Sequence, residues 1–145
     1  MSWSDKYISP PIPFKPRGRD FSGCDCGGLV LLVLKDHFDI EARDTEKEYE
    51  DGNFGRPTQA KLSSLGSAID NALGDEWHPV SRENSRPGDL VIFAPRGIPC
   101  HVGLVVSPGK MIHVEEGSGQ SMLSDIHGIE WGSKVKGYYR HAKML

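Results

Sequence analysis

The sequence predicts an α+β fold in which N-terminal helices pack on an antiparallel β-sheet meander. Apolar residues between positions 29 and 38 fall at helical spacing, and a segment starting at residue 57 has a similar pattern. From Pro79 on, short apolar segments alternate with turn signals, which is typical of strands. Helices followed by consecutive strands indicate helices packed on one antiparallel sheet. A chain of 145 residues is long enough for one domain with one sizeable core.

The N-terminal segment, residues 1–18, is expected to be an extended proline-rich arm, and residues 19–145 are expected to form a single domain. Residues 8–18, ISPPIPFKPRG, contain four prolines and a glycine. Proline lacks the N–H group that regular structure requires, so this stretch favours an extended chain. No apolar core with a small-residue cleavage site precedes it, and we therefore expect no signal peptide.

The first predicted helix starts near residue 26. Ser22 or Asp25 can cap it, because either side chain can accept hydrogen bonds from free N–H groups of the first turn. Its inner face is formed by apolar residues at helical spacing: Leu29, Val30, Val33, Leu34 and Phe38. Cys26 is therefore expected in the first turn of a buried helix.

A second helix is expected to begin at Pro57, since proline suits a first helical turn. Gly74 fits the position beyond its end. The inner stripe of this helix consists of Leu62, Leu65, Ile69 and Leu73.

Four strands are predicted in the C-terminal half. Each is an apolar segment next to a turn signal, and the segments are RPGDLVIF (86–93), HVGLVVS (101–107), KMIHVEE (110–116) and VKGYYRHA (135–142).

Composition excludes several classes of partner. The formal net charge is −3 and no basic block is present, so neither nucleic acid nor a membrane surface is an expected partner. The longest apolar run, residues 29–34, is too short for membrane insertion. Three cysteines are an odd number, which argues against a disulfide framework and for synthesis in a reducing compartment.

Cys26 is the first candidate for chemistry. A helix N-terminus stabilises a thiolate and is expected to lower the pKa of this thiol. Gly27 and Gly28 weaken a helix, but small residues beside a nucleophile leave room for a substrate backbone. The alternative is that Cys26 is a small buried apolar residue, as many free cysteines are.

A nucleophilic cysteine needs a base and a group that orients this base. His101 opens one predicted strand and His113 lies in the next. With a regular two-residue loop at Pro108 and Gly109, His113 would pair with Leu104 across the strands. The side chains of His101 and His113 would then point to opposite faces of the sheet. A bulge or a three-residue loop would place His113 opposite Gly103, diagonal to His101 and within reach. The catalytic interpretation requires this second register.

The blocks SGCDCGGLV, RPGDLVIF, HVGLVVSPGKMIHV and the terminal GYYRH resemble the NlpC-type cell-wall peptidases, which are papain-like cysteine peptidases of bacteria and phages. The resemblance covers about residues 14–141 and is greatest to the small peptidase encoded among phage tail genes. It implies a papain-like fold, with Cys26 as nucleophile, His101 as general base and His113 as the group that orients His101. It also implies that the backbone N–H of Cys26 contributes to an oxyanion hole.

The activity implied is that of a cysteine endopeptidase on peptidoglycan stem peptides, commonly between D-glutamate and diaminopimelate, with no metal or other cofactor. The implied partners are the stem peptide and phage tail-tip or hub proteins. The implied location is the virion, after synthesis in the bacterial cytoplasm without a signal peptide.

By the resemblance, three further positions are expected to bind substrate: Gly27, Phe14 and Asp25. We expect Asp25 mainly to cap the helix, and Asp89 in the Pro-Gly-Asp block to form a turn. Phe14 stands where the family usually has a tyrosine, so a hydroxyl is missing there. Tyr7 is the candidate substitute for it. Cys24 replaces a large apolar residue and is expected to fill a packing position.

Two alternatives remain open. The first is a zinc site, for which the sequence contains enough ligands. Its spacing argues against zinc, because Cys-x-Cys at a helix start points the two side chains apart. The ligands of such a site would be Cys24, Cys26, Cys100, His101 and His113. The second alternative is a structural tail-tip protein with a weak or inactive peptidase site.

Overall fold

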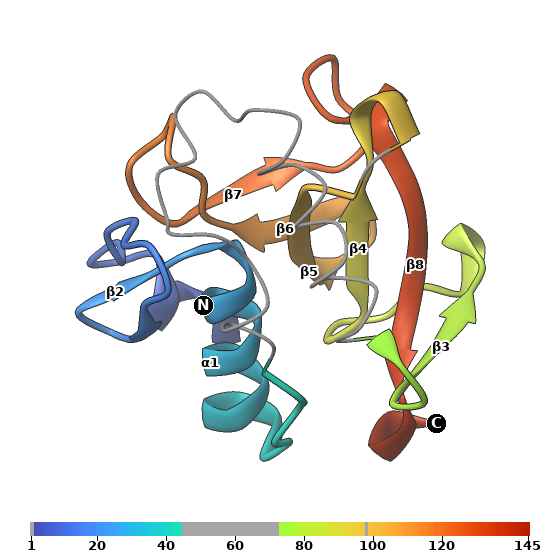
Figure 1. The fold of residues 1–145 in the computed structure, drawn as a ribbon, viewed down its shortest axis with the longest axis horizontal. Helices are drawn as coiled ribbons and strands as arrows, with labels where there is room; N and C mark the ends of the chain where they lie inside the picture. Colours follow the sequence, from blue (N-terminus) through green and yellow to red (C-terminus); the bar gives the residue numbers. More distant parts are fainter. Residues whose placement is uncertain (1, 45–72, 98) are drawn as a thin grey trace.

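The computed structural model describes residues 2–44, 73–97 and 99–145. The helix α1 (Cys26–Phe38) packs against a six-stranded antiparallel sheet, which confirms the α+β class (Figure 1). The second helix, expected from Pro57, lies outside the described residues. Within the described ranges, no helix is long and apolar enough to cross a bilayer.

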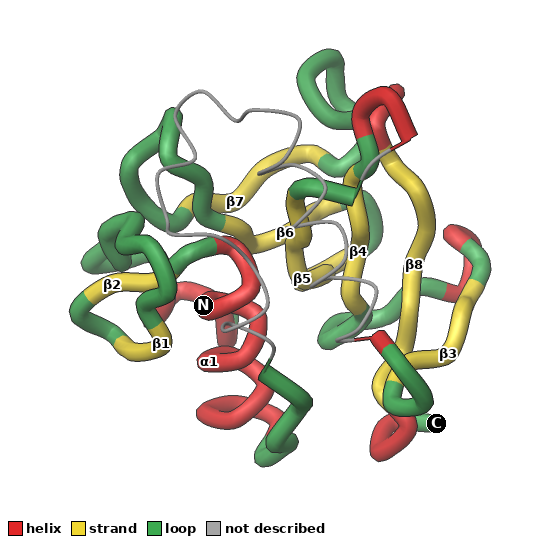
Figure 2. The backbone as a smooth tube through the Cα atoms, in the orientation of Figure 1, coloured by secondary structure: helices red, strands yellow, loops and turns green. Residues whose placement is uncertain are grey.

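The large sheet has the strand order β3-β8-β4-β5-β6-β7. Strands β4, β5 and β6 follow one another as the expected meander, and β7 continues it. Strand β8, expected as the last strand of the meander, instead lies on the opposite side of β4 and separates it from β3 (Figure 2). The bounds are β3 (Trp77–Val80), β4 (Leu90–Phe93), β5 (His101–Ser107), β6 (Lys110–His113), β7 (Met122–Asp125) and β8 (Val135–His141). A two-stranded sheet of β1 (Arg19–Asp20) and β2 (Gly23–Cys24) directly precedes α1.

The strands β3 and β7 were not predicted, and both lie at edges of the sheet. Strand β3 contains Pro79, which an edge strand tolerates because one side of its backbone needs no ladder partner. Strand β7 has no fully buried residue, so it lacks the alternation of apolar and polar residues by which strands are recognised.

The two faces of the sheet support separate apolar clusters, because side chains alternate along each strand. On one face, α1 packs on even-numbered residues of the strands, including Ile92, Leu104 and Ile112. The opposite face carries a second cluster, which consists of Val91, Phe93, Val105, Met111, Ile126, Trp131 and Tyr138. The site histidines lie on this second face, where the His101 ring contacts Phe93 and Trp131 of the cluster.

The N-terminal segment is not extended over its whole length, contrary to expectation. Trp3–Tyr7 form a 3₁₀-helix, and Tyr7 and Ile12 are buried in the cluster that includes α1. The Ser121 hydroxyl accepts a hydrogen bond from Ile12 N–H (2.8 Å) and donates one to the Tyr7 carbonyl (2.6 Å). Burial of these two side chains ties the segment to the sheet. The domain boundary at residue 18 stays a prediction.

Candidate active site

Cys26 is the first residue of α1, and Asp25 is its N-cap. The Asp25 carboxylate accepts hydrogen bonds from the N–H of Gly28 (2.7 Å), the N–H of Arg17 (3.1 Å) and the Arg19 guanidinium (2.7 Å). Three donors within the chain account for this carboxylate, so its role in the structure is the expected cap. The cap fixes the direction in which Cys26 leaves the preceding strand.

The two glycines after Cys26 have different surroundings. A Cβ atom on Gly28 would lie 1.9 Å from the Gly18 carbonyl oxygen, whereas a Cβ on Gly27 would meet nothing closer than 3.9 Å. Gly28 is therefore required for packing against the loop before β1, which corrects the interpretation that both glycines make room for substrate. Gly27 keeps that interpretation, since it is half-buried and has open space around it.

The hairpin between β5 and β6 has the register that the catalytic interpretation requires. Ser107 pairs with Lys110 across a two-residue loop, but Val105 pairs with Met111, so Val106 is an extra, bulged residue. Beyond the bulge Leu104 pairs with Ile112, which places His113 opposite Gly103. The loop is thus the short one and the bulge supplies the shift.

This register brings His101 and His113 into contact. The Nε2 of His101 lies 2.8 Å from the Nδ1 of His113, and the Nε2 of His113 lies 2.7 Å from the Ser124 hydroxyl oxygen. Both histidines are buried, with 6% and 1% of their surfaces exposed. A Cβ on Gly103 would come within 2.6 Å of the Met111 sulfur, so glycine suits the position between the two imidazoles.

Aromatic side chains hold His101 in place. The Trp131 ring stacks on the His101 imidazole, with 4.7 Å between centroids and 20° between planes, and meets His113 edge-on at 5.2 Å. Phe93 lies 5.7 Å from His101 on the neighbouring strand. The sequence did not identify Trp131 or Ser124 as site residues. Trp131 lies in an irregular segment, and Ser124 lies in the unpredicted strand β7.

The sulfur of Cys26 lies near the start of β5, at the backbone of Val102, which follows His101 in the sequence. The N–H groups of Val102 and Gly27 are within hydrogen-bonding reach of this sulfur. Since the Nε2 of His101 is engaged by His113, its Nδ1 is the ring nitrogen left to exchange a proton with a thiol.

Burial dominates the ionisation of these groups. It raises the pKa of the Cys26 thiol to about 12; the Asp25 charge adds to this rise, and the two backbone N–H groups oppose it. Burial lowers the pKa of His101 to about 3, helped by His113 and Lys134, and lowers that of His113 to about 4. In the free protein, thiol and imidazole are both neutral. The N–H of Gly27 at the helix N-terminus lowers the thiol pKa as expected, but burial outweighs this contribution, so the expected net lowering is wrong.

The two aromatic candidates of the N-terminal segment lie apart from each other. Phe14 forms an isolated parallel bridge with Cys24, two residues before Cys26. Tyr7 donates its hydroxyl to Asp36 (2.6 Å) in the C-terminal half of α1. Ten residues of helix, about 15 Å, separate Asp36 from Cys26. Tyr7 therefore does not replace the missing hydroxyl.

The other two cysteines have packing environments. Cys24 is fully buried, its thiol faces the Asp20 carbonyl, and burial raises its pKa to about 12. Cys100 is half-buried, and its pKa is also raised by burial. Among the described residues, which include all five ligands of the zinc alternative, no three histidine, cysteine or acidic side chains converge to hold a metal ion.

Comparison with known proteins agrees with this geometry. The model of the NlpC/P60 family matches residues 12–140. The probable endopeptidase NlpC of Escherichia coli is 26% identical over 124 residues, which cover 82% of this chain and 62% of that protein. The E. coli murein DD-endopeptidase MepS/murein LD-carboxypeptidase is 24% identical over 120 residues, 83% of this chain and 50% of its own length. The chain thus spans about half to three-fifths of these relatives.

Solved structures show the same fold at low identity. An NLP/P60-family protein similar to a lipoprotein from Staphylococcus aureus superimposes with a TM-score of 0.61 at 18% identity, over 94% of this chain and 39% of that one. The NlpC/p60 domain of the peptidoglycan hydrolase SagA gives 0.52 at 17% identity, over 89% and 86% of the two chains.

Proposed function

The chain belongs to the NlpC/P60 family, and from this premise we propose that it is a cysteine endopeptidase that hydrolyses amide bonds in peptidoglycan stem peptides. The observation that carries the proposal is the placement of Cys26, at a capped helix N-terminus, beside the start of β5. This strand begins with His101, which is hydrogen-bonded to His113 at the end of β6. The choice of substrate is supported by similar proteins, among them the probable endopeptidase NlpC, the murein DD-endopeptidase MepS and the peptidoglycan hydrolase SagA.

In the proposed reaction, His101 accepts the thiol proton as the sulfur of Cys26 attacks the scissile carbonyl carbon. The N–H of Cys26 is a proposed donor to the resulting oxyanion. His101 then protonates the departing amine, the C–N bond breaks and a thioester remains. Water attacks the thioester while His101 takes up its proton, and the acid product leaves as the sulfur regains a proton.

The neutral resting state has a consequence for this cycle. A thiol of raised pKa beside an imidazole of lowered pKa does not form a stable ion pair in the free protein. Proton transfer is therefore expected to accompany attack on a bound carbonyl rather than to precede binding. Such a site attacks a positioned substrate and reacts slowly with small electrophiles that lack binding contacts.

Digestion of purified peptidoglycan by the wild type and by Cys26→Ala tests the function. We expect the variant to lose at least about 10³-fold in rate, because removing the nucleophile leaves only binding and oxyanion contacts. Cys100→Ala is the matched control and should keep its activity, since Cys100 is half-buried next to the site without a role in the reaction. Mass spectrometry of the released muropeptides identifies the bond, with D-glutamate–diaminopimelate cleavage the proposed result.

Equal digestion by wild type and Cys26→Ala would contradict the mechanism. No digestion by either protein would favour the alternative of a structural component with an inactive site, which the phenylalanine at position 14 makes worth testing.

We also propose that the chain acts from a phage tail tip, with tail-tip or hub proteins as partners and the virion as its location. The order of motifs, which resembles that of the small tail-encoded peptidase, is the support for this setting. Detection of the chain in purified phage particles by mass spectrometry tests it, and absence from the particles would contradict it.

A further inference from the structure

We propose that Ser124 is a positioning residue of this site: its hydroxyl accepts a hydrogen bond from the Nε2–H of His113 and thereby stabilises the tautomers in which the Nδ1 of His101 can accept the thiol proton. This inference rests on the proposed function for its catalytic consequence, but its structural claim can be tested without any activity.

Ser124 continues the line of polar side chains that begins at His101. Within the sheet, Ser124 pairs with Met111, two residues before His113, so Ser124 is diagonal to His113 on the same face. His113 is in turn diagonal to His101. Three successive strands, β5, β6 and β7, therefore place one polar side chain each on a single diagonal, with contacts of 2.8 Å and 2.7 Å between them.

The distances allow either direction of donation along these hydrogen bonds, and the role of His101 as base selects one of them. A neutral imidazole has one protonated nitrogen and one acceptor nitrogen. For His101 to take a proton at Nδ1, its Nε2 must carry the hydrogen and donate it to the Nδ1 of His113. His113 is then protonated at Nε2, and this N–H needs an acceptor. The Ser124 oxygen, 2.7 Å away, is that acceptor.

The opposite tautomers would disable the site. If His113 carried its hydrogen on Nδ1, His101 would have to accept at Nε2 and would present Nδ1–H to Cys26. A protonated Nδ1 cannot take a proton from the thiol. Both rings are buried and their pKa values are lowered, so the tautomeric state rather than the charge is what a neighbouring acceptor decides.

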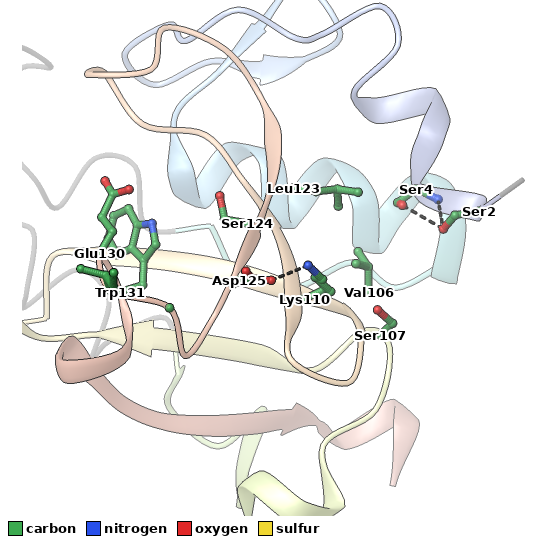
Figure 3. Close-up of a pocket in the computed structure, with 12 residues that line it drawn as sticks. Ser2, Ser4, Val106, Ser107, Lys110, Leu123, Ser124, Asp125, Glu130 and Trp131 are labelled. Carbon is green, nitrogen blue, oxygen red and sulfur yellow. Dashed lines mark hydrogen bonds and ion pairs between the residues drawn. The ribbon is translucent and has the colours of Figure 1, made fainter.

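Ser124 also lines a pocket of about 550 Å³ that runs along β7 (Figure 3). Trp131, which stacks on His101, lies at one end of this pocket, and Ser2 and Ser4 lie at the other. The side chain of Ser124 is therefore accessible from a second side, whereas His113 is 1% exposed. A smaller side chain at position 124 would admit water as a substitute acceptor, so alanine is a poor test.

Threonine and valine at position 124 form a matched pair of variants. The two side chains have almost the same shape and both suit a strand, but only threonine has a hydroxyl. We expect Ser124→Thr to keep most of the activity. Ser124→Val should lose about 10- to 100-fold in kcat with little change in KM, because one hydrogen bond to a buried group is lost and substrate contacts are not.

Nuclear magnetic resonance of ¹⁵N-labelled histidine reports the tautomer directly, because protonated and unprotonated ring nitrogens have different shifts. In the Cys26→Ala background, we expect His113 protonated at Nε2 with serine or threonine at position 124, and a population protonated at Nδ1 with valine. This measurement needs no turnover, so it tests the inference even if the protein digests no peptidoglycan.

Unchanged His113 tautomers in Ser124→Val would overturn the proposal, as would equal kcat values for the threonine and valine variants. The expected tautomer change in a protein that lacks activity would support the positioning role and count against the proposed function alone.

Discussion

Two glycines, Gly27 and Gly28, follow Cys26 in the first turn of α1, but their surroundings differ. Gly28 faces the Gly18 carbonyl oxygen, whereas Gly27 faces open space beside Cys26. The chain pattern alone gives no means to separate them, because both stand in the first turn of the same helix. The structure assigns packing to one and leaves the other for substrate.

Alanine substitution of each glycine tests this division. Gly28→Ala should lower the free energy of unfolding by about 2–3 kcal/mol, since a Cβ 1.9 Å from a backbone oxygen forces the loop to move. Gly27→Ala should leave stability unchanged or raise it by up to about 1 kcal/mol, because alanine favours a helix. Denaturant unfolding measures both.

Activity measurements distinguish the two glycines a second time, because only Gly27 is expected to lie beside the substrate. Gly27→Ala is expected to lower kcat/KM for peptidoglycan fragments, because its methyl group occupies space beside the nucleophile. Full activity in this variant would show that substrate does not approach Gly27.

At the level of elements, Asp89 both forms a turn and joins two strands of the sheet. Asp89 forms the expected turn, accepting a hydrogen bond from Arg86 N–H (2.7 Å), and it also binds Arg140 of β8 through two contacts of 2.8 Å. Its side chain is 1% exposed and that of Arg140 is 11% exposed. The turn before β4 is thereby tied to β8, a strand some fifty residues later.

Breaking the buried Asp89–Arg140 ion pair should lower the free energy of unfolding more than breaking an exposed ion pair. Asp89→Ala should lower the free energy of unfolding by about 3 kcal/mol, because Arg140 loses its carboxylate in a buried setting. The matched control is Asp125→Ala, whose partner Lys110 and own side chain are more than half exposed; it should cost less than about 1 kcal/mol. Equal losses in the two variants, measured by denaturant unfolding, would contradict the assignment.

The hairpin of β5 and β6 shows how an element is partly readable from sequence. Pro108 and Gly109 mark its turn, and Gly109 has a φ of +77°, which suits the second central residue of a type II turn. The Pro108-Gly109 pair favours a type II turn, and such a turn does not match the strand twist of a regular two-residue hairpin. The sequence does not show where the hairpin adjusts to this turn. The bulge lies at Val106, and its position depends on packing on both faces of the sheet.

For the molecule as a whole, the buried histidine pair makes stability depend on pH. Folding lowers the pKa of His101 to about 3 and of His113 to about 4, whereas an unfolded histidine titrates near 6.5. Between these values the unfolded chain binds more protons. The contribution of the pair is therefore complete above pH 6.5 and is lost as pH falls towards the folded values.

We expect the free energy of unfolding to fall below pH 6.5 by up to about 1.4 kcal/mol per pH unit for each of the two histidines. Unfolding at pH 7 and pH 5 measures this slope. The control is the double variant His101→Asn, His113→Asn, in which other acidic groups remain and the slope should be smaller. The same slope in both proteins would show that the pair does not titrate as described.

By itself, the sequence determined the α+β class, the capped helix that starts at Cys26, the four apolar strands and the candidate trio of Cys26, His101 and His113. These depend on local periodicity, turn residues and a motif order that a linear pattern carries. Only the tertiary structure decided the bulge at Val106, the acceptor Ser124, the stacked Trp131 and the neutral state of the thiol. Each of these depends on burial or on contacts between distant strands, and such contacts are set by packing across the whole sheet rather than by neighbouring residues.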